Sequence, residues 1–466
     1  MSIKNTHFGA GRISSMLRGA KKIFFIGIGG VSMSSLAAIT KQNGFSVAGS
    51  DRAPSAVTKK LETLGIEVFY GHDAGHIVNI DAVIYTVAIS SDNPEYLQAE
   101  KLGIPLISRA DYLGYIMTFS KNRVGIAGMH GKSTCTSMCA QVYMTAGVDP
   151  TIVSGAEYSP MGGFYRVGKG DDFLFEACEY MDSFLDFSPT TAVLLNVELE
   201  HVDYFGTLEK VIESYGKFAA LVGEGGKIIY NLDDKNVIAA VEGVKGEKIT
   251  FGLGANADFS ARNISMTSGC PAFDIYKNGE FFTHIELKVP GKHNVYNALA
   301  AAAAAATDGI SPEKIAEGLA AFVGAKRRME FRGYLNGCRV YDDYGHHPTE
   351  IAATLDGARA LCGGGRLICA FQSHTYSRTA ALFDDFVDAL KHADKVLLAP
   401  IYAAREENVF GISSDDIAAK IDGAESLPDF ETLAKRLGEV VQMGDLLVIM
   451  GAGSIEKVFD HLELQK

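Results

Sequence analysis

The sequence lacks any long hydrophobic run. No stretch of the 466 residues approaches the roughly 18 consecutive apolar residues of a membrane-spanning helix. The longest apolar-looking segment, ALAAAAAAAT at residues 298–307, is mostly alanine and predicts a buried, closely packed helix. Residues 1–22 also lack the hydrophobic stretch of a signal peptide. We therefore expect a protein that does not associate with membranes.

Cysteine and positive charge are also scarce. Seven cysteines, without any Cys-x-x-Cys pair, indicate reduced thiols and a cytoplasmic location. Lysine and arginine number 43 against 56 aspartates and glutamates, so the formal net charge is −13. This charge argues against a general nucleic-acid or anionic-membrane binder. A small basic pocket for an anionic ligand remains compatible with it.

Short β-branched runs are abundant, and each leads into a glycine turn and an amphipathic stretch. Examples are KKIFFIGIGG, NRVGIAGMHGK and LLVIMGAGS. This order of elements is typical of parallel α/β sheets. The sequence has no tandem repeat, so it does not predict a solenoid. The chain is too long for one core, and polar links occur near residues 118–122 and 324–333. We therefore predict three α/β domains, over residues 1–119, 120–325 and 326–466.

The first glycine turn, FFIGIGGVSMSSLA, lies between a predicted strand and a predicted helix. Gly27, Gly29 and Gly30 let the backbone approach a pyrophosphate at the helix N-terminus. Asp51 ends the next strand, where an acidic residue commonly binds ribose hydroxyls. Ser32 replaces the third glycine of the dinucleotide fingerprint. The motif alone leaves open a nicotinamide or flavin site, another nucleotide site and a purely structural turn.

The second glycine turn, GIAGMHGKST at residues 125–134, has an unusual spacing. Ile126 stands where the common phosphate loop has a glycine. The loop still offers backbone N–H groups for phosphates, Lys132 for their charge, and the Ser133 hydroxyl for Mg²⁺. The alternative is an ordinary helix start with a surface lysine. The sequence favours an ATP-type loop of a variant kind.

Further polar residues follow later predicted strands. Glu176, Glu179 and His201 could complete Mg²⁺ sites beside a triphosphate loop, although such residues taken singly are usually structural or solvated. Together with the loop, the pattern favours Glu176 and His201. Asn294 and Asn297 lie one helical turn apart and could contact adenine or ribose, or simply cap and pack. These two alternatives remain open.

The segment RVYDDYGHHPTEIAATL places a polar cluster at the end of a predicted strand, where α/β sheets bind ligands. The paired histidines could suggest a metal, but no third ligand has convincing spacing, so phosphate or substrate contact is favoured. Arg378, in FQSHTYSRT, is either a phosphate clamp or part of a surface salt bridge. The cluster consists of Asp342, Asp343, Tyr344, His346 and His347, with Pro348 suited to the first helical turn.

Taken in order, these segments resemble the Mur ligase family along nearly the whole chain. The resemblance rests on GIGGVSMSSLA, GSD, GMHGKST, EACEY, LNVELEHVDYF, GKHNVYNALAA, DDYGHHPTEI and GAGSIEKV. The ATP loop of that family has the glycine spacing seen here, so Ile126 marks a family variant. The resemblance implies a Rossmann-like domain for a UDP-sugar, a central P-loop ATPase-type α/β domain, and a C-terminal Rossmann-like α/β domain for an amino acid.

The segment DDYGHHPTEI is most specific to the alanine-adding branch and its close relatives. The resemblance implies ATP- and Mg²⁺-dependent ligation of L-alanine to the lactyl carboxylate of UDP-N-acetylmuramate through an acyl phosphate, a step in peptidoglycan precursor synthesis. We expect a cytoplasmic monomer or homodimer without nucleic-acid or membrane partners. The alternatives are a recycling ligase that adds a whole tripeptide, a nicotinamide-dependent oxidoreductase and a non-catalytic nucleotide-binding regulator.

The resemblance also implies roles for individual residues. The UDP-sugar contacts would be Gly27, Gly29, Gly30, Ser50, Asp51, His72 and Arg109. The ATP contacts would be Gly128, Met129, His130, Gly131, Lys132, Ser133, Thr134, Asn294 and Arg327, with Arg328 as the alternative to Arg327. The metal ligands would be Ser133, Glu176 and His201. The active-site rim of the last domain would be Asp343, Tyr344, His347 and Arg378. The catalytic residues would be Lys132, Glu176, His201 and His347.

The chain departs from the common family pattern at a few positions. These departures bear on fine specificity, because the loop lysine, the implied metal ligands and the DDYGHHP segment are all retained. The departing residues are Ser32, Met129, Cys178, Ser373 and Thr375.

Overall fold

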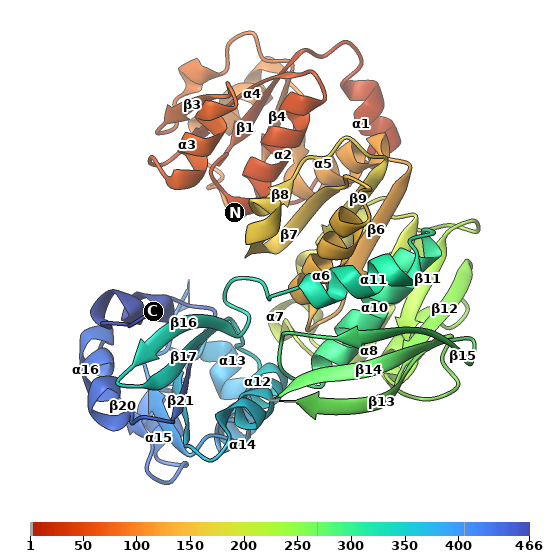
Figure 1. Ribbon diagram of the computed structural model, residues 1–466. Coiled ribbons are helices and arrows are strands. Elements are labelled where there is room, and N and C mark those ends of the chain that lie inside the picture. The colour runs from red at the N-terminus through yellow and green to blue at the C-terminus, as the bar shows by residue number, and fades with distance from the viewer. Residues whose placement is uncertain (1–2, 268, 405) are drawn as a thin grey trace. The chain divides into compact units, whose positions relative to one another are not determined.

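The computed structural model describes residues 3–267, 269–404 and 406–466 (Figure 1). The chain divides into two compact units. The first comprises Met1–Phe259 and Ala300–Ile315, and the second comprises Ser260–Leu299 and Ala316–Lys466. Both units contain mostly parallel sheets with helices between successive strands. Among the described residues, no helix is both long and apolar enough to cross a membrane.

The N-terminal sheet of the first unit is entirely parallel, with strand order β3-β2-β1-β4-β5. Successive connections run outward from β1 to β3 and then return to β4, so the topological switch lies between β1 and β4. Ligands of such sheets bind outside the carboxyl ends of the strands at this switch. The strands are β1 (Lys22–Ile26), β2 (Ser46–Asp51), β3 (Glu67–Tyr70), β4 (Ala82–Tyr85) and β5 (Leu106–Ser108).

Five helices accompany this sheet. Their bounds are α1 (Ala10–Met16), α2 (Val31–Gln42), α3 (Ala56–Thr63), α4 (Pro94–Leu102) and α5 (Arg109–Ile116). The first glycine turn joins β1 to α2, as the sequence predicts. Both β1 and β4 are apolar and buried almost throughout, as expected of parallel strands covered on both faces.

Seven strands of a ten-stranded sheet belong to the first unit, in the order β12-β11-β10-β6-β9-β7-β8. Strand β6 (Asn122–Ala127) lies between β9 (Asp172–Glu176) and β10 (Thr191–Leu194) and is parallel to both. The segments that follow these three strands therefore meet at one edge. The other strands are β7 (Thr151–Tyr158), β8 (Gly163–Arg166), β11 (Lys227–Asn231) and β12 (Glu247–Gly252), and the helices are α6 (Lys132–Thr145), α7 (Val202–Phe205), α8 (Leu208–Ala220) and α9 (Lys235–Val241).

One hydrophobic core joins the two sheets of the first unit. It includes Phe25 and Tyr112 from the N-terminal part and Phe175 and Phe218 from the central part. The packing is tight at Gly114 of α5, where an added Cβ would lie 1.8 Å from the backbone oxygen of Asp186. The N-terminal and central parts are thus packed against each other through a continuous apolar interior.

The second unit contains a six-stranded sheet with the order β16-β17-β21-β18-β19-β20. Only the edge strand β16 is antiparallel, and the bridge between Tyr334 and Gln465 brings the C-terminal residues back to it (Figure 1). The strands are β16 (Glu330–Leu335), β17 (Cys338–Asp343), β18 (Leu367–Phe371), β19 (Lys395–Leu398), β20 (Glu425–Ser426) and β21 (Leu446–Met450). The helices are α12 (Pro348–Cys362), α13 (Tyr376–Ala381), α14 (Phe383–Leu390), α15 (Ser414–Ala418) and α16 (Phe430–Val440).

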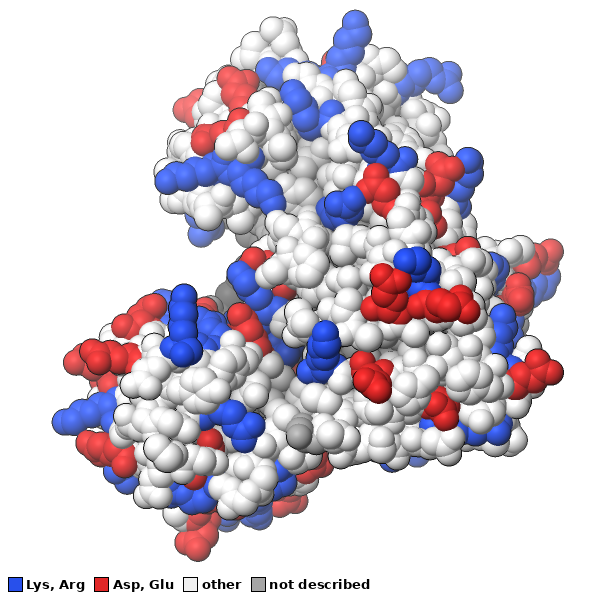
Figure 2. Space-filling model, viewed as in Figure 1, with Lys and Arg blue, Asp and Glu red and all other residues white. Residues whose placement is uncertain are grey.

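The chain reaches this sheet through three strands and two helices. Strands β14 (Cys270–Lys277) and β15 (Glu280–Glu286) form an antiparallel hairpin after β13 (Phe259–Thr267). Helices α10 (His293–Thr307) and α11 (Pro312–Ala321) follow, and the alanine-rich segment falls within α10, buried as predicted. Acidic and basic side chains are interspersed over the face of the molecule shown in Figure 2.

Candidate active site

The second glycine turn links β6 to α6 at the edge where β6, β9 and β10 end. Gly131 has φ of 81°, a left-handed conformation that favours glycine, and α6 begins at Lys132. An added Cβ on Gly128 would lie 2.8 Å from Cβ of Leu195. The turn therefore needs glycine at both places, and it directs the first backbone N–H groups of α6 toward the open edge of the sheet. Ser133 in this first turn is buried, and Thr134 is half-buried.

Asn196, just beyond β10, holds the backbone of this loop. His130 N donates to Asn196 Oδ1 at 2.8 Å, and Asn196 Nδ2 donates to His130 O at 2.9 Å. Met129 N donates to the backbone oxygen of Asn196 at 3.2 Å. The sequence interpretation did not identify Asn196, although its position directly after a buried strand is a usable signal. Asn196 therefore holds the backbone of the loop through three hydrogen bonds.

Half-buried Lys132 and buried Glu179 form an ion pair, with Nζ 3.0 Å from Oε2. The ammonium also donates to the backbone oxygens of Gly128 and Met129 at 2.6 and 3.2 Å. Burial alone would raise the pKa of Glu179, but Lys132 and a hydrogen bond with His201 lower it to about 2. Burial likewise opposes the charge of Lys132, yet nearby carboxylates, Glu179 foremost, raise its pKa. Both groups are therefore charged at neutral pH.

Three potential metal ligands lie beside this pair. Glu179, Glu200 and His201 each offer an atom, and these atoms all lie within 4.8 Å of one another. Two carboxylates and an imidazole form a donor set that a divalent cation such as Mg²⁺ can use, since Mg²⁺ prefers oxygen ligands. The residues present therefore fit a bound cation. His201 also belongs to the set predicted from the sequence.

Glu176 makes a different contact. Its Oε2 accepts a hydrogen bond from Gly155 N at 2.8 Å, and an added Cβ on Gly155 would lie 2.7 Å from its Oε1. The carboxylate thus lies against the backbone of β7. It is still near enough to Lys132 to raise that group's pKa. Of the two glutamates considered in the sequence, the structure pairs Glu179 directly with the loop lysine.

The first glycine turn is held by the end of β2. The N–H groups of Gly27 and Ile28 both donate to Ser50 O at 2.9 Å, and Gly29 N donates to Asp51 Oδ2 at 2.8 Å. Asp51, expected to meet a ribose, thus also shapes the loop. Gly30 caps α2, whose N-terminus carries unpaired N–H groups suited to an anion.

Two other predicted contacts of the UDP-sugar lie close to this turn. His72 Nδ1 is 3.1 Å from Ser50 Oγ. Arg109 Nη1 donates to Ser32 Oγ at 3.0 Å, from the start of α5 to the first turn of α2. The serine that departs from the common family pattern is therefore the hydroxyl that orients Arg109. The structure thus gathers the predicted UDP-sugar contacts around one turn.

In the second unit, the DDYGHHP segment follows β17 and turns into α12. Buried Asp343 accepts hydrogen bonds from Gly345 N at 2.7 Å and Met329 N at 2.8 Å, and burial raises its pKa although Arg328 opposes this. His347 is the N-cap of α12 and accepts from Thr349 N through Nδ1 at 3.3 Å. Asp343 and His347 therefore help to build the loop that presents Tyr344.

Arg327 and Arg328 both lie against Tyr344. Their guanidinium carbons are 5.0 and 5.2 Å from the centre of its ring. Arg327 also donates through Nη2 to Gly451 O at 2.7 Å and approaches Asp342 Oδ1 at 3.5 Å. Burial raises the pKa of Asp342 to about 6 in spite of Arg327 and Arg332. The cation–π contacts and these hydrogen bonds fix the arginines at the sheet edge.

Asn294 and Asn297 bond to each other at the start of α10. Asn297 Nδ2 donates to Asn294 Oδ1 at 3.0 Å, and Asn294 Nδ2 donates to Pro290 O at 2.7 Å. Both side chains are buried. The two amides therefore form hydrogen bonds within the protein, and their contact with adenine or ribose stays a prediction.

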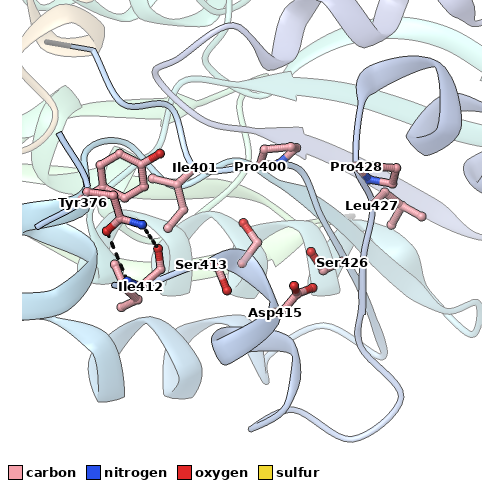
Figure 3. A pocket seen from close by; sticks show the side chains of 11 residues that line it. Tyr376, Pro400, Ile401, Ile412, Ser413, Asp415, Ser426, Leu427 and Pro428 are labelled. Atoms are coloured by element: carbon pink, nitrogen blue, oxygen red, sulfur yellow. Dashed lines mark hydrogen bonds between the residues drawn. The ribbon is translucent and has the colours of Figure 1, made fainter. Parts of the chain in front are cut away.

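A cavity of about 350 Å³ opens at the carboxyl ends of β19 and β20 (Figure 3). Its lining combines apolar groups, such as Pro400 and Ile412, with Ser413 and Asp415. Tyr376 also lines it and begins α13, the short helix that carries Arg378. The cavity therefore lies at the same carboxyl-terminal end of the sheet as Asp343 and Tyr344, and β19 is three strands away from β17.

Three family models match the chain in succession. They describe the catalytic domain of the Mur ligase family at residues 22–121, the Mur ligase middle domain at 126–305 and the glutamate ligase domain of Mur ligases at 327–453. Curated relatives also align with more than nine-tenths of the chain at over 40% identity. The chain therefore belongs to the Mur ligase family. The prediction of three α/β domains of this type is confirmed.

Individual relatives narrow the comparison. The UDP-N-acetylmuramate–L-alanine ligase of Clostridium acetobutylicum is 44% identical over 94% of this chain and 96% of its own length. The solved UDP-N-acetylmuramate–alanine ligase of Thermotoga maritima has a TM-score of 0.78 and 26% identity, and covers 94% of this chain and 98% of its own. A murein peptide ligase of Psychrobacter arcticus follows with a TM-score of 0.72 and 25% identity, covering 95% and 98%.

Proposed function

We propose that this protein joins L-alanine to the lactyl carboxylate of UDP-N-acetylmuramate and converts ATP to ADP and phosphate. One observation carries the proposal: a phosphate loop whose lysine is paired with a buried glutamate lies in a chain whose relatives at over 40% identity are UDP-N-acetylmuramate–L-alanine ligases. The product is UDP-N-acetylmuramoyl-L-alanine, a peptidoglycan precursor.

The reaction needs an activated carboxyl group, because a carboxylate is a poor electrophile. A lactyl oxygen attacks the γ-phosphorus of ATP, the bond to the β-phosphate oxygen breaks, and ADP leaves. The amine of L-alanine then attacks the acyl phosphate, phosphate departs with the former carboxylate oxygen, and the nitrogen loses a proton. Such a transfer depends on positioning and charge neutralisation more than on a protein nucleophile.

The protein's own groups meet these needs. Lys132 places a positive charge at the mouth of the loop, and the N–H groups around Gly131 bind the phosphates. We assign ATP contacts to Gly128, Met129, His130, Gly131, Lys132, Ser133, Thr134, Asn294 and Arg327. We assign UDP-sugar contacts to Gly27, Gly29, Gly30, Ser50, Asp51, His72 and Arg109. We assign the amino-acid end of the site to Asp343, Tyr344, His347 and Arg378.

Mg²⁺ would neutralise phosphate charge and orient the transferred group when bound. His201 is shared by the two candidate ligand sets, one with Ser133 and Glu176 and the other with Glu179 and Glu200. Glu176→Gln and Glu179→Gln distinguish them, because only a change at a true ligand raises the Mg²⁺ concentration needed for half-maximal rate. We name Lys132, Glu176, His201 and His347 as catalytic.

The succession of three domains suits a separate binding site for each of the three substrates. We propose domains at residues 1–119 for the UDP-sugar, 120–325 for ATP and 326–466 for the amino acid. The gaps between the matched family segments, near residues 121–126 and 305–327, support these bounds. We further propose that the protein acts in the cytoplasm as a monomer or homodimer, without nucleic-acid or membrane partners. Size-exclusion chromatography with light scattering tests the oligomeric state.

The second candidate is a recycling ligase that adds a whole tripeptide. The similarity to a murein peptide ligase favours it, but that similarity is at 25% identity against over 40% for the alanine-adding relatives. A nicotinamide-dependent oxidoreductase remains the more remote alternative and leaves the GMHGKST loop without a purpose.

The deciding experiment measures phosphate release with Mg²⁺, ATP and UDP-N-acetylmuramate. L-Alanine, glycine, L-serine, the tripeptide and no amine are compared, and the product is weighed by mass spectrometry. We expect preference for L-alanine and a product heavier by one alanine residue. Preference for the tripeptide would move the protein to the recycling branch, and no turnover with any amine would refute ligation.

A further inference from the structure

A buried carboxylate that the proposed mechanism does not use lies beneath the candidate UDP-sugar site. Glu95 is in the first turn of α4, and its side chain is 0% exposed. An unpaired carboxylate in such a place would be strongly unfavourable. The hydrogen-bond partners of Glu95 must therefore account for its burial.

Both oxygens of Glu95 accept hydrogen bonds from the neighbouring loops. Ser50 Oγ donates to Oε2 at 2.6 Å, and His72 Nδ1 bonds to the same oxygen at 2.8 Å. His76 Nδ1 bonds to Oε1 at 2.7 Å. An ionised carboxylate can only accept, so each histidine must carry a proton on Nδ1. Glu95 thus imposes this protonation pattern on both rings.

The hydrogen-bond network connects the buried carboxylate of Glu95 to two histidines that are partly exposed. The side chains of His72 and His76 are 21% and 19% exposed, whereas Glu95 is fully covered. His76 is further fixed by stacking on Phe69, with ring centres 4.3 Å apart. Glu95 therefore cannot touch a ligand, but His72 can.

Ser50 connects the same carboxylate to the first glycine turn. Its backbone oxygen accepts from Gly27 N and Ile28 N, both at 2.9 Å, while its hydroxyl is held by Glu95. The rotamer of Ser50 and the tautomer of His72 are thus set by one group. Both residues are among the proposed contacts of the UDP-sugar.

We propose that Glu95 is a positioning residue for the UDP end of the substrate. It holds the His72 ring through a hydrogen bond to Nδ1, which leaves Nε2 to bond to a ligand. It also holds the Ser50 hydroxyl, while Ser50 O accepts from Gly27 N and Ile28 N, so the turn keeps the shape that presents the N-terminus of α2 to the diphosphate. This inference rests on the proposed function, because it concerns the same UDP-sugar site.

The test compares Glu95→Gln with Glu100→Gln, an exposed glutamate on the same helix. Glutamine keeps the shape but can no longer accept from all three donors. We expect the KM for UDP-N-acetylmuramate to rise about tenfold, with kcat and the KM for ATP within about twofold of wild type. Glu100→Gln should match wild type. An unchanged KM for the UDP-sugar, or equal losses for both substrates, would overturn the inference.

Two further measurements separate positioning from simple stability. Long-range ¹H–¹⁵N spectra should show the Nδ1-protonated form of His72 in wild type and its loss in Glu95→Gln, with His72→Gln assigning the signal. An unaltered tautomer in Glu95→Gln would contradict the inference. His76→Gln leaves Ser50 and His72 on Glu95 and should raise the same KM only about threefold. A larger rise than in Glu95→Gln would place the decisive contact at His76 and overturn it.

Calorimetric titration of the wild-type protein with UDP-N-acetylmuramate separates this inference from the proposed function. If the wild-type protein binds the UDP-sugar and Glu95→Gln binds it equally well, the positioning role is refuted and the proposed function stands. If the wild-type protein does not bind it, the proposed function itself is refuted.

Discussion

The two glycine turns of the first unit are built alike and charged differently. Each follows a buried parallel strand and leads into a helix, and each is held by a residue from a neighbouring strand end: Ser50 for the first turn and Asn196 for the second. The second turn adds a lysine paired with a buried carboxylate, whereas the first has a histidine and a serine hydrogen-bonded to a buried glutamate. In the proposed function, the same backbone design serves a triphosphate in one place and a UDP-sugar in the other.

Removal of the loop lysine should have the largest effect, because it should abolish activity at the second turn and leave the first turn intact. We expect Lys132→Ala to lower the rate of phosphate release by at least about 10³-fold, because no other side chain of the loop supplies that charge. Binding of the UDP-sugar at the first turn should persist, as measured by calorimetry. Retention of more than a tenth of the wild-type rate would show that Lys132 is dispensable.

The same variant leaves Glu179 buried without its cation. We expect a loss of unfolding free energy of about 3 kcal/mol, measured by urea denaturation at neutral pH. Lys132→Ala combined with Glu179→Gln should recover part of that stability and none of the activity. A double variant as unstable as Lys132→Ala would indicate a different cause.

The charge of Glu179 should also make the free energy of unfolding depend on pH. Its folded pKa of about 2 lies below the ordinary value of 4.5, so the stabilisation is present above pH 4.5 and is lost as the pH falls toward 2. Glu179→Gln should be less stable than wild type at neutral pH by on the order of 2–3 kcal/mol. That difference should shrink in acid, as followed by urea denaturation at several pH values. A constant difference would refute the assignment.

Asn196→Ala tests how much the hydrogen bonds between Asn196 and the loop contribute to ATP binding at the second turn. Loss of the two side-chain hydrogen bonds with His130 should loosen the loop and raise the KM for ATP about tenfold. The KM for the UDP-sugar is the internal control and should not change. Equal changes in both KM values would mean that the two turns are not independent.

Ser32→Gly should have the smallest effect, at the first turn. It restores the common family residue and removes the hydroxyl that bonds to Arg109 Nη1. We expect the KM for the UDP-sugar to rise about threefold, with the KM for ATP unchanged. A lower KM in the variant would show that Ser32 does not help Arg109.

Much of this organisation can be predicted from local sequence patterns. Strand–glycine–helix order identified both turns, and the alanine-rich segment correctly predicted a buried helix. The roles assigned to individual site residues remain proposals. Local patterns could not decide between Glu176 and Glu179 as the direct partner of Lys132, since Glu176 ends β9 and Glu179 follows only three residues later. Nor could they indicate that Asn294 and Asn297 bond to each other.

The sequence by itself determined the features that depend on a few neighbouring residues. These are the glycine spacing, the lysine and hydroxyl at the start of α6, and the family to which the chain belongs. The tertiary structure alone decided which distant groups meet. The order β10-β6-β9 brings Asn196 and Glu179 to the loop after β6, and the order β2-β1-β4 brings Glu95 beneath Ser50. Contacts of this kind arise from strand pairing across long stretches of chain, which no local pattern encodes.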